Sequence, residues 1–449
     1  MTNLEVPELS GKVRSSLGPF AATLTGRERE VLASLLRPAS HNQLDALRSS
    51  PAEEILTPEE LGTYSLLALE RRPPQPGLRT QTVMVMKATR LCNLRCTYCH
   101  SWREGPGNSM TFPVLAKATR DVLQGDGVRS VQFVWHGGEV TMRSVDFYRK
   151  ALWLQEQFRR NGQRVANSVQ TNGTNLTDEW VEFLAQFGFS VGVSLDGPPE
   201  IHDKRRVDRN GRSTSSAVHA GMARLAASGV PFGVLLVVTD EVVSLGAPRL
   251  LDYLLSLEIA SVALLNVIPA GITGGPTGDH IQWNCYVEFL RELFGLWWPQ
   301  HAQDLDIREL GTLVSLIDGR NVGRQQCIFA GDCMGQFLTI EPDGDVSACD
   351  KFVGQEEFSF GNLLRERLAT LLSQSRQLAA VRVEESAANH LLSVCEWFQV
   401  CNGGCPHDRR LNEWLGAPGP AVCCGLAPLL EDIRERVRMF GVRPLSIRE

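Results

Sequence analysis

Three features are missing from this chain of 449 residues, and each absence removes a class of function. Basic residues are not in surplus, since 45 Lys and Arg stand against 51 Asp and Glu, so no nucleic-acid partner is expected. No uninterrupted apolar run reaches the ~18 residues of a membrane-spanning helix, so no membrane association is expected. The N-terminal residues have neither the basic nor the apolar region of a secretory signal. We therefore expect a cytoplasmic protein.

Cysteine is absent from the first 91 residues, and the 12 cysteines that follow are unevenly spaced. Three lie together at Cys92, Cys96 and Cys99, and one stands alone at Cys285. The other eight are Cys327, Cys333, Cys349, Cys395, Cys401, Cys405, Cys423 and Cys424. A reducing cytoplasm disfavours disulfides, and thiols that only fill a core would not cluster, so we interpret the two groups as metal ligands. Cys285 lies in an apolar stretch, and we expect it to be a buried core thiol.

The N-terminal 70 residues carry helical signals. Apolar residues recur at helical spacing over residues 25–36, and Thr57-Pro-Glu-Glu60 is a capping pattern with proline at the first helical position. Three prolines within residues 71–77 forbid a helix there and favour an extended linker. We therefore predict a small helical domain with its linker over residues 1–77.

From residue 81 the chain alternates short β-branched runs with amphipathic helices. Strands are predicted over residues 82–86, 130–134, 167–170, 190–194, 232–238 and 261–265. Helices are predicted over residues 113–123, 144–160, 177–186 and 215–228. This alternation predicts an α/β fold with a parallel sheet, open or curled toward a barrel, and functional loops at the strand C-terminal ends. After about residue 300 the alternation stops, so we place the barrel at 78–300 and a small metal-organised domain with a C-terminal helix at 301–449.

The first group of cysteines follows the first predicted strand with the spacing Cx3Cx2C. Three thiolates on one loop suit an iron–sulfur cube, and a cube with only three protein ligands leaves one iron open to a small molecule. The alternative is a zinc site completed by His100.

This motif, with Tyr98 before its last cysteine, resembles the radical S-adenosylmethionine (SAM) enzymes. The resemblance implies a partial (β/α)6 TIM-like barrel, a catalytic [4Fe–4S] cluster on the three cysteines, and Tyr98 in the cofactor site. In that family SAM chelates the open iron, and its reductive cleavage gives a 5′-deoxyadenosyl radical that abstracts hydrogen. After the second strand, Gly137, Gly138 and Glu139 resemble the family's GGE motif. The glycines permit close backbone approach, and Glu139 offers an anion to the methionine ammonium group.

Two further segments resemble the anaerobic sulfatase-maturating enzymes and their peptide-modifying relatives: residues 170–174 and 193–206. The resemblance implies that Ser194 and Arg206 contact the methionine carboxylate and the ribose of SAM. The adjacent Arg205 leaves that choice open by one residue, and one of the two arginines lies on a solvated face in the alternative interpretation. His136 stands where this family often has Gln just before its Gly-Gly-Glu.

The second group of cysteines resembles the SPASM domain, which carries two auxiliary [4Fe–4S] clusters. By motif position, Gly344 lies in a hairpin turn, and the first auxiliary cluster takes Cys327, Cys333, Cys349 and Cys405. The second auxiliary cluster takes Cys395, Cys401 and Cys423. A full array has one more cysteine where this chain has Leu392. The second cluster therefore either has an open or non-cysteine ligand, with His390 or Cys424 as candidates, or is absent.

Asp350 follows a predicted cluster ligand, and a carboxylate at this position resembles the general base of the sulfatase-maturating enzymes. In the alternative interpretation, Asp350 caps a turn or pairs with Lys351.

Together these features predict a radical SAM enzyme that abstracts hydrogen from a side-chain carbon of a peptide or protein. The product is a crosslinked or oxidised residue, in a ribosomally made peptide, with one electron leaving through the auxiliary clusters. Flavodoxin or ferredoxin is the expected type of electron donor. The alternatives are a sulfatase maturase that forms formylglycine, a non-catalytic iron–sulfur electron carrier, and a structural zinc protein. The sequence leaves the substrate and the bond formed open.

Overall fold

The computed structural model describes residues 41–69, 78–99, 101–268, 280–319, 327–331, 333–352, 354–414 and 425–440. The helix expected at residues 25–36, the linker at 71–77, His100, Cys423 and Cys424 lie outside these described residues.

A single sheet organises the described chain, and its ten described strands follow the order β10-β9-β8-β1-β2-β3-β4-β5-β6-β7. The seven strands from β1 to β7 run parallel to their neighbours. They are β1 (Gln81–Thr89), β2 (Ser130–Gly137), β3 (Arg164–Thr171), β4 (Ser190–Ser194), β5 (Phe232–Val238), β6 (Ser261–Asn266) and β7 (Asp306–Ile307). The predicted α/β fold with a parallel sheet is confirmed, and the predicted bounds of β4 and β5 are those observed.

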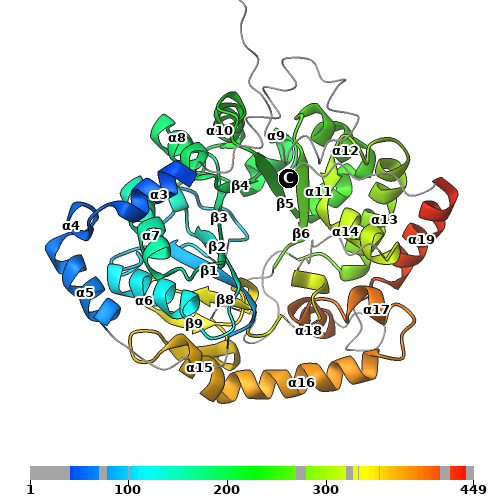
Figure 1. Ribbon diagram of the computed structural model, residues 1–449. Coiled ribbons are helices and arrows are strands. Elements are labelled where there is room, and N and C mark those ends of the chain that lie inside the picture. The colour runs from blue at the N-terminus through cyan, green and yellow to red at the C-terminus, as the bar shows by residue number, and fades with distance from the viewer. Residues whose placement is uncertain are drawn as a thin grey trace, which may run out of the picture.

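Helices connect the parallel strands and lie around the curved sheet (Figure 1). They are α6 (Phe112–Leu123), α7 (Val145–Phe158), α8 (Asp178–Phe187), α9 (Pro199–Arg205), α10 (Ser215–Ala227), α11 (Asp240–Leu245), α12 (Ala247–Ser256), α13 (Trp283–Gln300) and α14 (Arg308–Ile317). Local chemistry sets their limits: at α8 the Thr177 side chain accepts the Trp180 N–H, and Gly188 ends the helix at φ 64°. Their apolar faces bury a core of aliphatic and aromatic side chains against the sheet.

The expectation that the βα alternation stops near residue 300 is wrong. Strand β7 pairs in parallel with β6, and α14 follows it directly. A strand of two residues is too short to show an alternating pattern, which is why the sequence did not reveal it.

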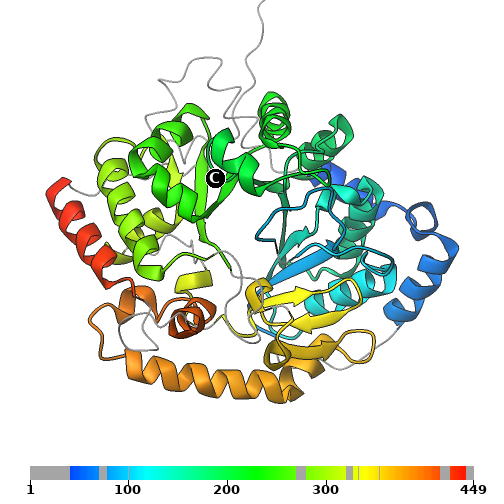
Figure 2. The same cartoon turned by 180° about the vertical axis from the view of Figure 1, so that it is seen from behind.

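The C-terminal part continues the same sheet, because β8 (Phe337–Ile340) pairs in parallel with β1. Strand β8 forms an antiparallel hairpin with β9 (Asp345–Ser347), and the predicted turn is confirmed, with Gly344 at φ 94°. The remaining elements are η3 (Cys327–Phe329), η4 (Asp350–Phe352), η5 (Glu356–Phe358), β10 (Ser359–Asn362), α15 (Leu368–Gln374), α16 (Arg376–Leu392), α17 (Phe398–Cys401), α18 (Pro406–Trp414) and α19 (Ala427–Phe440). In both views α16 runs along one edge of the molecule (Figures 1 and 2).

Three N-terminal helices, α3 (His41–Ser49), α4 (Ala52–Ile55) and α5 (Pro58–Leu69), lie outside the barrel helices α6 and α7 (Figure 1). The predicted capping box is confirmed: the Thr57 N–H donates to Glu60 at 2.9 Å, and the Glu60 N–H donates to the Thr57 hydroxyl at 3.4 Å. Tyr64 packs edge-on against Trp153, whose indole N–H donates to the Ser50 carbonyl. These helices are therefore fastened to the outer layer of the barrel. None of the described helices is long and apolar enough to cross a bilayer.

Candidate active site

A cavity of 1880 Å³ runs along the inner face of the parallel sheet from the starts of β4 to β7 to the strand C-terminal ends, and most of the predicted site residues face it. Cysteines of both groups line it: Cys92, Cys96, Cys99, Cys327 and Cys405. So do six further residues that the sequence singled out: Tyr98, Gly137, Gly138, Ser194, Arg206 and Asp350. The loops after β1, β2 and β4 thus carry predicted site residues at the strand C-terminal ends, and their functional role stays a prediction.

The loop after β1 holds its thiols close to hydrogen-bond donors. The Leu94 N–H donates to Cys92 Sγ at 3.3 Å, and the Ser101 N–H donates to Cys99 Sγ at 3.4 Å. The Arg206 guanidinium donates to Cys96 Sγ at 3.5 Å. Burial, with further contributions from Glu139 and the neighbouring thiols, raises the pKa of Cys92 to about 12. Three thiols on one loop are the donor type of an iron–sulfur cluster with one open iron, and their binding of it stays a prediction.

Gly137 and Gly138 brace the cysteine loop through backbone contact. A Cβ atom at Gly137 would overlap the Thr89 carbonyl oxygen, and one at Gly138 would overlap that of Leu91. The close approach lets the Gly138 N–H donate to Thr89 O at 2.7 Å and the Glu139 N–H donate to Leu91 O at 2.8 Å. The glycines are thus required by the packing of β2 against the loop that carries the thiols.

Glu139 is almost completely buried, and its carboxylate is held by the protein. It accepts the N–H and hydroxyl of Thr141, the hydroxyl of Thr171 and the N–H of Asn172, at 2.7–3.0 Å. Burial raises the pKa of Glu139, and these hydrogen bonds oppose the rise. The carboxylate therefore ties β2 to the end of β3, and its predicted contact with the methionine ammonium group stays a prediction.

The structure separates the two adjacent arginines. Arg206 donates to Asp196 at 3.0 Å and its guanidinium lies over the Tyr98 ring, whose hydroxyl also bonds Asp196. Arg205 points elsewhere and pairs with Glu241 at 2.6 Å. Only Arg206 faces the cysteines and the cavity, so the geometry favours it over Arg205 as the predicted SAM contact.

Two residues that the sequence did not single out support this cluster. The Asp196 N–H donates to His202 Nδ1 at 3.2 Å, and burial lowers the pKa of His202 to about 4, so the imidazole stays neutral and can accept. Gln170 donates to the Ser194 hydroxyl at 3.0 Å and orients it. Both lie inside the segments 170–174 and 193–206 noted in the sequence, Gln170 in β3 and His202 in α9.

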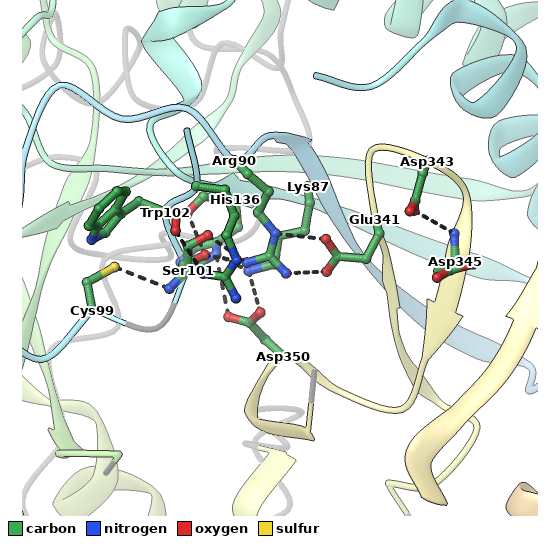
Figure 3. A network of polar contacts seen from close by, with 12 residues as sticks. Lys87, Arg90, Cys99, Ser101, Trp102, His136, Glu341, Asp343, Asp345 and Asp350 are labelled. Atoms are coloured by element: carbon green, nitrogen blue, oxygen red, sulfur yellow. Dashed lines mark hydrogen bonds and ion pairs between the residues drawn. The ribbon is translucent and has the colours of Figure 1, made fainter. Parts of the chain in front are cut away.

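Asp350, the predicted base, lies at the start of η4 and pairs with Lys87 and His136 of the barrel (Figure 3). Lys87 Nζ is 2.7 Å from His136 Nδ1, and His136 Nδ1 is 3.5 Å from Asp350 Oδ2. The alternative pairing of Asp350 with Lys351 is wrong, because Lys351 pairs with Asp408 at 2.7 Å. Lys87 was missed because it continues an apolar strand pattern and carries no spacing signal of its own.

A second bridge between the barrel and the C-terminal part was also missed. Arg90, directly after β1, makes a two-pronged ion pair with Glu341 at the end of β8 (Figure 3). Arg90 also donates to the carbonyl and hydroxyl of Ser101 on the cysteine loop. This bridge docks the β8–β9 hairpin against the loop that carries the first three thiols.

The four cysteines predicted for the first auxiliary cluster come from separate segments and influence one another. Burial, reinforced by Cys405, Cys333 and Cys327, raises the pKa of Cys349 well above its usual range. Burial, with contributions from Asp408 and Cys327, raises the pKa of Cys405 to about 12. The Lys351 ammonium group is 3.8 Å from Cys405 Sγ. This set of thiols again fits a metal cluster, while its individual ligands remain predictions.

The residues predicted for the second auxiliary cluster are only partly described. Cys395 and Cys401 lie just before and at the end of α17, and Leu392 is buried at the end of α16. The ligand set of this cluster therefore stays a prediction. The expectation for Cys285 is wrong: its side chain is exposed, because the buried face of α13 carries Tyr286 and Val287 instead.

Comparison with known proteins agrees with this site. The chain matches the Radical SAM superfamily over residues 86–243 and the SPASM iron–sulfur cluster-binding domain over residues 327–405. It is 30% identical over 373 residues to the serine-type anaerobic sulfatase-maturating enzyme of Bacteroides thetaiotaomicron. The alignment covers 78% of this chain and 88% of that protein. It is 28% identical over 342 residues to a cysteine-type anaerobic sulfatase-maturating enzyme of Clostridium perfringens. That alignment covers 74% of this chain and 90% of the relative.

Solved structures show the same architecture. Native anSMEcpe with bound AdoMet superimposes with a TM-score of 0.68 at 26% identity, covering 80% of this chain and 97% of that one. Streptococcus suis SuiB bound to its precursor peptide SuiA shares the fold, with a TM-score of 0.53 at 15% identity, covering 82% of this chain and 79% of that one.

The fold and the cysteine loop define a radical SAM enzyme. The chain belongs to the radical SAM superfamily, in its SPASM-containing group, with the anaerobic sulfatase-maturating enzymes as relatives. The predicted cofactors, a catalytic [4Fe–4S] cluster with SAM and auxiliary iron–sulfur clusters, are confirmed at the level of the family. This sets aside the alternatives of a structural zinc protein and a non-catalytic electron carrier.

Proposed function

We propose that this enzyme modifies a side-chain carbon of a ribosomally made peptide, with a crosslinked or oxidised residue as product. The observation that carries the proposal is that Cys92, Cys96, Cys99, Arg206 and Asp350 line one cavity. Its volume of 1880 Å³, part of which the predicted clusters would fill, exceeds the roughly 300–1,000 Å³ of a typical small-molecule site, and this supports a substrate in addition to SAM.

The cofactor-binding residues of this proposal are those that the family resemblance implies, and their shared place around the cavity supports them. Cys92, Cys96 and Cys99 would hold the catalytic cluster, and Arg206 and Ser194 would orient the carboxylate and ribose of SAM. When bound, these groups supply a 5′-deoxyadenosyl radical that abstracts hydrogen, and the auxiliary clusters supply a one-electron acceptor. Cys327, Cys333, Cys349 and Cys405 would hold the first auxiliary cluster.

Asp350 provides the chemistry that the cofactors lack. Its carboxylate lines the cavity and is about one quarter exposed, so a substrate can reach it. It follows Cys349 directly, which places a proton acceptor beside the predicted electron acceptor. A hydroxyl, thiol or amide of the substrate would lose its proton to this carboxylate as the neighbouring carbon is oxidised.

A second candidate is the maturation of a sulfatase, in which a Ser or Cys side chain becomes formylglycine. It is favoured by the 30% identity to a serine-type maturase over 88% of that protein's length. His136 and Leu392, where the resembling maturases have Gln and Cys, favour a different substrate. A peptide substrate is common to both candidates, as is an electron donor such as flavodoxin or ferredoxin.

One experiment tests both candidates. The reconstituted enzyme is incubated anaerobically with dithionite, SAM and either a short peptide encoded beside its gene or sulfatase peptides that carry Ser or Cys. Mass spectrometry of each peptide, with chromatography of 5′-deoxyadenosine, then identifies the substrate. We expect stoichiometric modification of the encoded peptide only. Conversion of a sulfatase peptide to formylglycine would establish the second candidate instead, and 5′-deoxyadenosine without any modified peptide would contradict both substrates.

A further inference from the structure

Lys87 is an unusual residue for the core of a parallel sheet. It lies near the end of β1 between Met86 and Ala88, and its side chain is completely buried. A lysine is almost never fully buried unless its charge is paired. Burial lowers the pKa of Lys87, and the adjacent Asp350 carboxylate opposes that effect. The lysine is therefore maintained by specific partners.

Both partners face the cavity, whereas Lys87 does not. The ammonium group pairs with Asp350 and lies 2.7 Å from His136 Nδ1 (Figure 3). His136 and Asp350 line the cavity, and Lys87 lies behind them. The cation thus sits on the protein side of two groups that a substrate can touch.

This arrangement fixes the state of the imidazole. An ammonium group has only donors, so His136 Nδ1 accepts from Lys87, and a neutral imidazole then carries its proton on Nε2. His136 Nδ1 is 3.5 Å from Asp350 Oδ2, whereas the Asp350 carboxylate forms an ion pair with Lys87. Without the lysine, a proton on Nδ1 would let His136 bond Asp350 directly and draw the carboxylate away from its present position.

We propose that Lys87 is a positioning residue for the proton-transfer step: it holds the Asp350 carboxylate toward the cavity and sets the tautomer of His136. The inference rests on the proposed role of Asp350 as base. It differs from simple docking of the two parts of the chain, because the Arg90–Glu341 ion pair already joins β1 to the β8–β9 hairpin. Lys87 positions Asp350 and His136, whereas Arg90 holds the β8–β9 hairpin against the barrel.

A double-mutant cycle tests this. Lys87→Met, Asp350→Asn and the double variant are compared with wild type for modified peptide formed per 5′-deoxyadenosine. If Lys87 acts through Asp350, Lys87→Met lowers this ratio by roughly 10²-fold, as loss of an acid–base catalyst does. In the Asp350→Asn background the same change has little further effect. Lys87→Arg, which keeps a buried cation, restores at least part of the ratio.

Controls separate this role from folding. Lys150 pairs with Glu60 outside the barrel, in a contact of comparable length, and Lys150→Met should leave the ratio at the wild-type value. Iron content and the visible absorption spectrum report whether each variant holds its clusters. If Lys87→Met does not fold, Lys87→Gln, which keeps a donor without the charge, replaces it in the cycle.

Three results would overturn the inference. The first is a wild-type ratio in Lys87→Met, and the second is a pair of losses that multiply in the double variant, which would make the two residues independent. The third is a wild-type ratio in Asp350→Asn, which would remove the proposed base itself. The first two results leave Asp350 as the base, the third removes it, and the peptide modification itself is tested separately by mass spectrometry, so these failures can be told apart.

Discussion

The two cysteine sites of this enzyme are built in opposite ways. In the first, three thiols lie within a single loop that β2 braces through Gly137 and Gly138. In the second, four thiols come from segments between residues 327 and 405, which are joined by strands, turns and one long helix, α16. A local loop on a completed sheet can take its shape before metal binds, whereas dispersed segments gain much of their order from the metal. If both groups bind clusters as predicted, the barrel prepares the first site and the metal helps to assemble the second.

The charges around the two sites differ as well. Arg206 faces the first site and contacts both Cys96 and Asp196. At the second site Lys351 lies between Cys405 and Asp408. Burial alone would raise the pKa of Asp408, but Lys351 and His407 hold it well below its usual range. Each site thus combines thiols with a half-buried cation and a carboxylate.

The largest effect is expected from the first site. Replacing Cys92, Cys96 and Cys99 together by Ala should abolish 5′-deoxyadenosine formation, because the radical-generating cluster loses all its protein ligands. Iron at the auxiliary site should remain, at about four to eight of the eight to twelve atoms per chain expected for two to three clusters. Iron analysis and chromatography measure both quantities. Deoxyadenosine at the wild-type level would remove the mechanism.

The second site is tested by Cys405→Ala. As a predicted cluster ligand, this thiol would join the start of α18 to three earlier segments, so its loss should collapse the C-terminal part and make it sensitive to proteolysis. Limited proteolysis with mass spectrometry locates the cuts. Cys285→Ala is the matched control, because that thiol is exposed on α13. A folded and fully active Cys405→Ala enzyme would contradict the assignment.

The contact between the two regions is tested by Asp350→Asn. The variant should still cleave SAM and exchange hydrogen with the substrate, while modified peptide falls by roughly 10²-fold or more, because the proton acceptor is lost. Asp343→Asn, on the exposed hairpin turn, is the control for a charge change nearby. Wild-type product from Asp350→Asn would leave His136 as the next candidate base.

Arg206 and Arg205 offer a matched pair within the first region. Arg206→Ala should raise the KM for SAM by roughly 10- to 100-fold, the range of one lost charged hydrogen bond. Arg205→Ala should change it much less, because its side chain pairs with Glu241 away from the cavity. Steady-state kinetics of both variants decide the assignment, and equal effects would contradict it.

The smallest effect is expected outside both regions. Tyr64→Ala removes an edge contact with Trp153 and should lower the midpoint of thermal unfolding by roughly 1–3 °C. Deoxyadenosine formation should not change.

We further predict that residues 1–70 recruit the peptide substrate. Deleting residues 1–70 should raise the KM for the peptide and leave SAM cleavage without peptide unchanged. Because α3–α5 pack on α6 and α7, the deletion exposes that surface, so the KM is measured on the folded fraction.

The sequence predicted local features well and dispersed features poorly. The periodicity of each βα unit and the spacing of Cys92, Cys96 and Cys99 are set by neighbouring residues, so they could be predicted. The choice between Arg205 and Arg206 depends on where α9 ends, because Arg205 is its last residue and Arg206 has already left the helical conformation. Lys87 and Asp350 are separated by 263 positions in the numbering, and no local pattern links them. The prediction that Cys285 is buried was wrong because apolar neighbours in the sequence do not show which face of the helix is buried.

The parallel pairing of β8 with β1 has a consequence for building chimaeras of such enzymes. Residues Val83 to Met86 lie opposite Phe337 to Ile340, so the C-terminal part shares a hydrogen-bonded seam with the first strand of the barrel. A graft joined near residue 300 would have to recreate this seam between strands of different parentage. Transplants that carry β1 and β8 together preserve it. In a recombined enzyme, β1 and β8 should therefore come from the same parent.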